Sequence, residues 1–119
     1  MIAFVILLLK SGAPYREFLH VDDLAQACLF LMGLPSSRFG TDASHLYNVG
    51  CGEDITIRDL AELVQKVVGF SGEVLWDDSK PDGTPRKLMD VTRMNSLGWQ
   101  ASISLQDGIT RVYHDYCKR

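Results

Sequence analysis

The sequence predicts a mixed α/β fold in which short strands alternate with helices, and three observations carry this prediction. Ile2 to Leu9 is an uninterrupted apolar run of the length that buried strands have. Residues 56–69 begin with a helix-capping threonine, end with a glycine and carry an apolar stripe in between. Residues 73–76 form a second strand-like segment. Neither repeats nor an obvious linker interrupt this order.

The composition is that of one ordinary globular domain. The chain has 119 residues, of which 46% are hydrophobic and 23% charged. A net charge of −3 argues against a nucleic acid held through contacts to its phosphate backbone, so we expect no nucleic acid partner. Cys28, Cys51 and Cys117 are odd in number and lack metal-ligand spacing. This pattern is typical of a reducing cytosol, and it predicts a cytoplasmic protein without a metal site.

The apolar run at the start has two interpretations. It is far shorter than the roughly 20 apolar residues that cross a bilayer as a helix, so we expect no membrane partner. As a signal peptide it lacks a basic leader and a clear cleavage site. Its length favours a buried strand. The alternative is a truncated or misassigned start of the chain.

The first helix is predicted to follow a strand. Residues 16–21 have the composition of a strand, and Asp22 and Asp23 are N-cap candidates. The helix is predicted to fade at Gly33. One face of it would comprise Leu24, Ala27, Cys28 and Leu31.

The second helix is the most strongly specified element. Residues 45–49 predict a strand before it, and Thr56 with Asp59 forms a variant of the capping box. Gly69 is a typical helix stop. The predicted buried stripe comprises Ile57, Leu60, Ala61, Val64 and Val68.

The last third of the chain predicts a strand, a polar loop and two helices. The strand spans residues 73–76 and the loop residues 77–87. A short helix is predicted over residues 90–97, ended by Gly98, and Ser104 is predicted to cap a final helix. The apolar side of the final helix would comprise Leu105, Ile109, Val112 and Tyr116.

The polar loop is the first candidate binding site. Lys80, Arg86 and Lys87 surround Asp82, and prolines and glycines shape the backbone. Cations suit a diphosphate, and a carboxylate suits a ribose diol or a base N–H. On spacing alone, a solvated turn with surface charges is the commoner explanation.

Arg16 is the second candidate, since it opens a strand after a Ser-Gly-Ala-Pro turn. A guanidinium there could bind a phosphate with two hydrogen bonds. The alternative is a surface arginine paired with Glu17 or an aspartate.

Other polar residues favour structural explanations. The carboxylates of Asp22 and Asp23 suit a helix start better than acid–base chemistry. No phosphate-binding motif follows Gly50-Cys51-Gly52, which is therefore predicted to be a turn. His20 is more typical of a packed core histidine than of a base. Cys51 has no adjacent histidine or cation in the sequence to activate it.

The order of motifs carries a family resemblance. REFLHVDDLA, YNVG, TIRDLAELV, SKPDGTPRKLMDVTR and LGW follow one another over about residues 11–119. The chain thereby resembles the C-terminal part of the GDP-L-fucose synthase family, which belongs to the extended short-chain dehydrogenase/reductases and to the NAD-dependent epimerase/dehydratase family. REFLHVDD is shared by many extended members, whereas the SKPDGTPRK segment is much more specific.

The resemblance implies an α/β fold that is the C-terminal substrate-binding portion of such an enzyme, lacking most of the Rossmann domain. The whole enzyme would convert GDP-4-keto-6-deoxy-D-mannose to GDP-L-fucose by epimerisation and NADPH-dependent reduction, as a homodimer. The missing N-terminal domain would bind NADP and supply the catalytic Ser, Tyr and Lys. Arg16 matches the arginine that contacts GDP, and Asp82 matches a substrate-binding aspartate. Arg86 and Lys87 lie in the same motif and are included in the substrate site.

The chain also departs from the family pattern. It has no glycine-rich fingerprint after a first strand, and no tyrosine is followed four residues later by lysine. The epimerising Cys and His of the family lie upstream of the match, so their roles are not assigned to Cys51 or His20. A substrate-contacting tryptophan of the family would fall at about Leu9. Residues 1–10 are therefore treated as an atypical apolar segment and residues 11–119 as the nucleotide-sugar-binding region.

These departures predict an isolated chain without catalytic, cofactor-binding or metal-binding residues of its own. Two alternatives stay open at this point. One is a part of another nucleotide-sugar epimerase or dehydratase. The other is a noncatalytic nucleotide-sugar-binding module.

Overall fold

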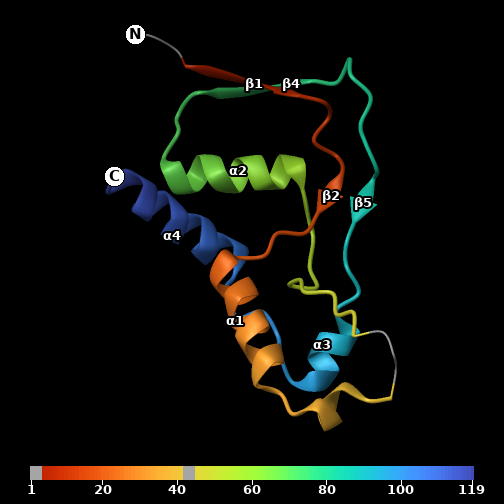
Figure 1. Ribbon diagram of the computed structural model, residues 1–119. Coiled ribbons are helices and arrows are strands. Elements are labelled where there is room, and N and C mark those ends of the chain that lie inside the picture. The colour runs from red at the N-terminus through yellow and green to blue at the C-terminus, as the bar shows by residue number, and fades with distance from the viewer. Residues whose placement is uncertain (1–3, 42–44) are drawn as a thin grey trace.

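The computed structural model describes residues 4–41 and 45–119, and it confirms the mixed α/β fold class (Figure 1). The elements in chain order are β1 (Val5–Leu9), β2 (Tyr15–Arg16), α1 (Val21–Gly33), a 3₁₀ turn η1 (Ser36–Phe39), β3 (Ile55–Thr56), α2 (Ile57–Val68), β4 (Glu73–Asp77), β5 (Arg86–Lys87), α3 (Thr92–Leu97) and α4 (Leu105–Cys117). Within the described part of the chain, the strands form a two-stranded sheet and a three-stranded sheet.

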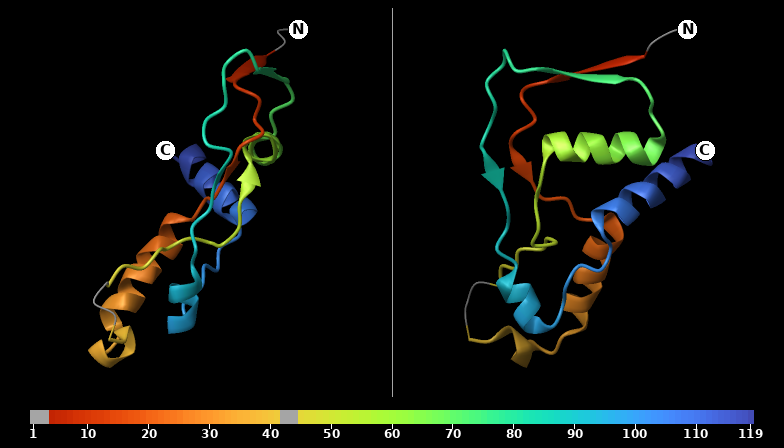
Figure 2. Two further views of the ribbon diagram at one scale, coloured as in Figure 1. Left: turned by 90° about the vertical axis from the view of Figure 1, so that its right-hand side faces the viewer. Right: turned by 180° about the vertical axis from the view of Figure 1, so that it is seen from behind.

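The apolar run forms β1, which pairs in parallel with β4 from Val5 opposite Glu73 to Leu9 opposite Asp77. The predicted strand is thus confirmed for its described part, while Ile2 lies outside the described residues. The predicted burial is wrong, because Phe4 is 68% and Leu7 59% exposed. Parallel strands normally have both faces covered. Here β1 and β4 form a narrow ribbon at one end of the described chain (Figure 2).

The second sheet has the order β3-β2-β5. Tyr15 and Arg16 pair antiparallel with β3 and parallel with β5, which places Arg16 opposite Lys87. The strand predicted over residues 16–21 is wrong beyond Arg16, since Val21 already begins α1. Residues 45–49 also form no strand. A strand needs a partner backbone, and the structure gives one to β2 but none to residues 45–49.

Helix α1 is capped two residues before the first predicted candidate, Asp22. His20 is the N-cap, and its Nδ1 accepts a hydrogen bond from the Asp22 amide at 3.1 Å. Asp22 and Asp23 lie in the first turn, where their negative charge suits the helix dipole. The prediction of Asp22 or Asp23 as the N-cap is therefore wrong. The imidazole nitrogen of His20 accepts the backbone hydrogen bond that a carboxylate was expected to accept.

The predicted ends of the other helices are largely confirmed. Gly69 and Gly98 stop α2 and α3 in left-handed conformations, with φ of 69° and 104°. Ser104 caps α4 by accepting from the Asp107 amide at 3.1 Å. Helix α3 begins at Thr92 and not at Asp90, whose carboxylate accepts from the Thr92 amide at 2.9 Å.

The cap of α2 is a reciprocal pair. Thr56 Oγ1 accepts from the Asp59 amide at 3.0 Å and donates to Asp59 Oδ2 at 2.6 Å. Replacing Thr56 by Ala should lower the free energy of unfolding by about 0.5–2 kcal/mol, the usual loss for an N-cap. Urea denaturation measures this loss, and Thr56→Ser should restore most of it. Thr110→Ala is the matched control, because the Thr110 hydroxyl only donates to Gln106 O within α4. A Thr56→Ala chain as stable as the control would contradict the assignment.

The core of the described chain is small. The buried hydrophobic side chains are Ala27, Met94 and Trp99, which pack between α1 and α3. The Cα radius of gyration is 18.2 Å, against about 13.5 Å for a compact domain of this length. The accessible surface is 8643 Å², against about 6,500 Å² for a compact protein of this mass. The chain is elongated and flat, with extents of 64 × 37 × 17 Å (Figure 2).

An apolar groove of about 520 Å³ runs between α2 and α4. The predicted stripes of the two helices meet there, because Leu60, Val64, Ile109 and Val112 all line it. The stripes are only partly buried, since Val112 is 58% exposed. None of the helices in the described residues is long and apolar enough to cross a membrane.

Candidate functional site

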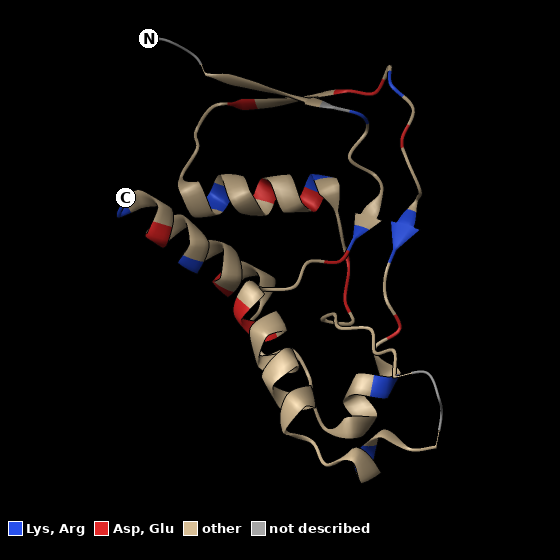
Figure 3. Ribbon diagram, viewed as in Figure 1, with Lys and Arg blue, Asp and Glu red and all other residues tan. Residues whose placement is uncertain are grey.

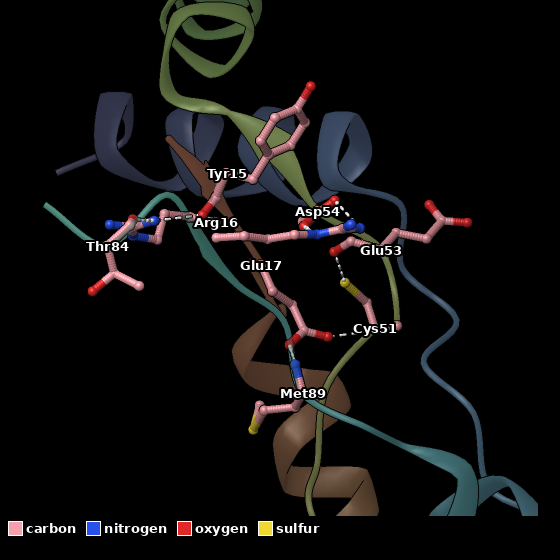
Figure 4. A network of polar contacts seen from close by, with 10 residues as sticks. Tyr15, Arg16, Glu17, Cys51, Glu53, Asp54, Thr84 and Met89 are labelled. Carbon is pink, nitrogen blue, oxygen red and sulfur yellow. Dashed lines mark hydrogen bonds and ion pairs between the residues drawn. The ribbon is translucent and has the colours of Figure 1, made fainter. Parts of the chain in front are cut away.

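Arg16 lies against the loop that carries Asp82. Its Nη1 donates to Thr84 O at 2.9 Å and to Tyr15 O at 2.5 Å (Figure 4). Its Nη2 lies 3.9 Å from where a Cβ on Gly83 would be. Pairing of β2 with β5 brings these distant segments together.

The charge of Arg16 has no carboxylate partner among the residues that the structure describes. The predicted alternative, an ion pair with Glu17 or an aspartate, is therefore not what the structure contains. Carbonyl oxygens orient the guanidinium without neutralising it. Such a group can still bind an anion.

Asp82 is exposed and joins its loop to the turn after β1. Its carboxylate accepts from the Ser11 amide at 3.1 Å and from the Ser11 hydroxyl. The Ser11 hydroxyl is the main cause of a lowered pKa of Asp82; slight burial opposes it, and the Ser11 amide and the charge of Lys10 add to the lowering. Asp82 is thus negatively charged at neutral pH, and its oxygens keep lone pairs for further donors.

Arg86 forms an ion pair with Asp54. Its Nε and Nη2 lie 2.5 Å and 3.1 Å from the two carboxylate oxygens, and its Cζ lies 5.8 Å from the centre of the Tyr15 ring. The hydrogen bonds and charge of Asp54 raise the pKa of Arg86 further above its ordinary value. The Asp54 side chain is 7% exposed, so Arg86 compensates a largely buried carboxylate. This pair ties β5 to the segment before β3.

Lys87 shares a sheet face with Arg16. The two residues are opposite each other in the parallel register, and Tyr15 is likewise opposite Arg86. Because neighbours along a strand point to opposite faces, Arg16 and Lys87 occupy one face and Tyr15 and Arg86 the other. Figure 3 shows a basic residue on each of the strands β2 and β5. The described structure therefore sets two cations side by side.

Glu17 is a contributor that the sequence analysis missed. Its carboxylate accepts from the amides of Gly52 at 2.8 Å and Met89 at 3.1 Å (Figure 4). It also fills the space where Gly50 would carry a Cβ. The sequence predicts Gly50 only as a turn residue. Glycine also occurs where another group approaches the backbone too closely for a Cβ, and this is its role beside Glu17. Glu17 thus holds the two segments that flank the Arg16 sheet.

Asp23, His20 and Cys51 make structural contacts in the described chain, although Asp23 is not the helix cap that the sequence predicts. Asp23 is 3% exposed and accepts from Ser102 and Ile103, not from a catalytic partner. The His20 side chain is 10% exposed and caps α1. The Cys51 Sγ lies 3.4 Å from the carbonyl oxygen of Phe18 and 3.2 Å from that of Glu53, so its single S–H has an acceptor in either direction.

Two hollows flank the loop and Arg16. A cleft of about 470 Å³ is lined by Arg16, Cys51, Asp54 and Ser102 among others. A smaller one of about 200 Å³ lies between residues 13–15 and Asp82, Gly83 and Pro85. Within residues 4–41 and 45–119, no group of three or more potential metal ligands occurs.

The described residues do not fit a dinucleotide cofactor. Such a site needs a strand that passes through a glycine-rich turn into a helix, whose N-terminus faces the pyrophosphate. Here β1 leads through the turn at Ser11 and Gly12 into β2, and β3 runs directly into α2 without a glycine turn.

Comparison with known proteins shows which proteins this chain is similar to. Residues 4–50 match the model of the NAD dependent epimerase/dehydratase family. The chain is 54% identical over 108 residues to GDP-L-fucose synthase 1 of Arabidopsis thaliana, covering 91% of this chain and 32% of that protein. It is 52% identical over 107 residues to GDP-L-fucose synthase of Escherichia coli K12, covering 87% and 33%. A GDP-mannoheptose C4 reductase from Campylobacter jejuni, solved with NADP bound, matches with a TM-score of 0.81 at 35% identity, covering 95% of this chain and 35% of that one.

The chain is similar to members of the NAD-dependent epimerase/dehydratase family, whose model its residues 4–50 match. The relatives at 52% and 54% identity are GDP-L-fucose synthases, so the resemblance inferred from the motifs is confirmed. The chain spans about a third of the length of these relatives.

Proposed function

We propose that this chain provides the GDP-sugar-binding part of a GDP-L-fucose synthase. The observation that carries the proposal is the position of Arg16, whose uncompensated guanidinium is held against the Asp82 loop with Lys87 on the same sheet face. The resemblance assigns Arg16 and Asp82 to the substrate site independently of this geometry. The whole enzyme would convert GDP-4-keto-6-deoxy-D-mannose to GDP-L-fucose.

The chemistry of the loop suits a nucleoside diphosphate sugar. Arg16 and Lys87 would bind the diphosphate oxygens, for which a guanidinium offers two parallel donors. Asp82, charged at neutral pH, would accept from ribose hydroxyls or guanine N–H groups. Arg86 would contribute mainly by holding β5 through Asp54. These residues would bind and orient the substrate.

Catalysis and the cofactor would belong to the remainder of the protein. NADP would supply the hydride there, since the described residues do not fit a dinucleotide. The apolar groove between α2 and α4 supports this division, because exposed apolar side chains of this kind mark a surface that packs against another part of a protein. Its occupant would be the part of the protein that this chain does not span. We further propose that the whole enzyme is a cytoplasmic homodimer, which sedimentation and cell fractionation would test.

Calorimetric titration with GDP and with NADPH, done separately, tests the proposal. The 119-residue chain should bind GDP, should not bind NADPH, and should not oxidise NADPH in the presence of GDP-4-keto-6-deoxymannose. A fusion to the part of the Escherichia coli relative that this chain does not match should bind both and turn over. Turnover by the chain alone, or a fusion that binds no GDP, would refute the proposal.

Titration with UDP beside GDP, together with the turnover assay of the fusion, separates the two alternatives. Preference for UDP over GDP would indicate another nucleotide-sugar epimerase or dehydratase. A fusion that binds GDP but never turns over would indicate a noncatalytic binding module. The higher identity to GDP-L-fucose synthases than to the heptose reductase favours the proposed activity.

A further inference from the structure

We propose that Ser11 is a positioning residue: its bonds to Asp82 clasp the 82–85 loop and thereby hold Arg16 in place for the nucleotide. The inference rests on the proposed function and extends it to a residue that does not itself contact GDP. It follows from three connected features of the structure.

The first feature is the clasp itself, which closes a gap of 71 positions in the chain. The amide and the hydroxyl of Ser11 both donate to the Asp82 carboxylate, one to each oxygen. The same hydroxyl oxygen accepts from the Ala13 amide at 3.0 Å, which orients it. Charge-assisted bonds of this kind are stronger than neutral ones.

The second feature is the anchoring of Ser11 to the rest of the fold. Arg58 in α2 donates from Nη2 to Ser11 O at 2.6 Å and from its amide to Gly12 O at 2.9 Å. The Arg58 guanidinium in turn stacks on Trp76 of β4, with Cζ 4.5 Å from the ring centre. The Trp76 ring also fills the space beside Gly12, where a Cβ would come within 2.6 Å of it. Ser11 is therefore held in place by Arg58 of α2, which is in turn held by Trp76 of β4.

The third feature is the link from the loop to Arg16. Thr84 O accepts from Arg16 Nη1 at 2.9 Å, and Pro85 O accepts from the Tyr15 amide at 2.8 Å. The loop is thus attached at Asp82 to Ser11 and at residues 84 and 85 to β2. Loss of the Ser11 attachment would free one end of the loop and, with it, the carbonyl that orients Arg16.

Positioning has a measurable consequence for binding. An arginine held in its bound conformation loses less side-chain freedom when the ligand arrives. Without the clasp, GDP affinity should fall about 3- to 10-fold, the range expected for ordering one flexible side chain.

Ser11→Ala in the full 119-residue chain tests the inference through three readouts. GDP affinity should fall as stated, the Arg16 side chain should become more mobile by ¹⁵N relaxation, and the pKa of Asp82 followed by carboxyl NMR should rise. The charge of Lys10, which also lowers the pKa of Asp82, remains in this variant, so a rise reports loss of the Ser11 hydroxyl bond. Ser11→Thr keeps the hydroxyl and should restore all three readouts. Ser71→Ala, at an exposed serine between α2 and β4, is the matched control.

Asp82→Asn completes a double-mutant cycle. If the clasp operates, Ser11→Ala should cost less affinity when Asp82 is already replaced. Should Ser11→Ala fail to fold, Ser11→Cys keeps a weak donor and should give intermediate values. Ser11→Ala with unchanged affinity, beside an Arg16→Ala chain that binds GDP weakly, would overturn this inference alone. A wild-type chain and a fusion that both fail to bind GDP would overturn the proposed function and this inference with it.

Discussion

Arg16→Ala is expected to weaken GDP binding about 10- to 100-fold, the scale on which charge-assisted hydrogen bonds contribute. The guanidinium has no carboxylate partner among the described residues, so its charge is available to the diphosphate. Alanine removes both the charge and the paired donors. Arg16→Lys should recover part of the affinity, because lysine keeps the positive charge but lacks the two parallel N–H donors of the guanidinium. Calorimetric titration of the chain with GDP measures each affinity.

The control for Arg16 is an arginine at the other end of the molecule. Arg38 in η1 donates to Leu97 O at 3.1 Å, far from the loop, so Arg38→Ala should leave GDP affinity unchanged. In the fusion, Arg16→Ala should leave NADPH affinity at the value of the unsubstituted protein, since the cofactor would bind elsewhere. Equal damage to GDP and NADPH binding would return Arg16 to a purely structural role.

Asp23→Ala is expected to destabilise the fold by about 2–3 kcal/mol, the cost of removing an ionised acceptor from buried donors. Asp23 is 3% exposed and joins α1 to the segment before α4. Its carboxylate accepts from the Ser102 amide at 3.1 Å, the Ser102 hydroxyl at 3.0 Å and the Ile103 amide at 2.9 Å. Alanine would leave these donors unpaired. Urea denaturation measures the loss, with exposed Asp22→Ala as the control.

The same carboxylate makes stability depend on pH. Burial alone would raise the pKa of Asp23, but the hydrogen bonds from Ile103 and Ser102 and the charge of His20 outweigh it, and the pKa lies below its ordinary value of 3.8. A depressed pKa contributes stability that is present above the unfolded pKa and is lost as pH falls through the folded one. Asp23→Asn should therefore flatten the acid limb of the stability profile below about pH 4. An unchanged acid limb would contradict this role.

The sequence by itself determined the helix ends and the family. Thr56, Gly69, Gly98 and Ser104 act at the predicted positions because a cap bonds to an amide only a few residues away. The motif order is likewise a property of the chain alone, and the relatives confirm what it predicted. The N-cap of α1 was missed because His20 satisfies a donor that aspartate usually takes.

Only the tertiary structure decided how the candidate site is assembled. The predicted site residues Arg16 and Asp82 proved to lie at one loop, but the groups that hold them, Ser11 and Glu17, carried no signal in the sequence. Arg86 proved to be paired with Asp54, 32 positions away. Contacts across such separations depend on which strands pair, and the sequence of a two-residue strand is too short to specify its partner strand.

Burial was the other property that the sequence could not decide. The apolar run at β1 predicted a buried strand, yet its side chains are largely exposed in the described chain. The local composition of an apolar run shows that the segment is suited to burial. Whether it is buried depends on a second layer of structure that packs against it. Because the hydrophobic effect is non-directional, an apolar segment does not specify which surface will cover it. That surface must come from elsewhere in the fold or from another chain.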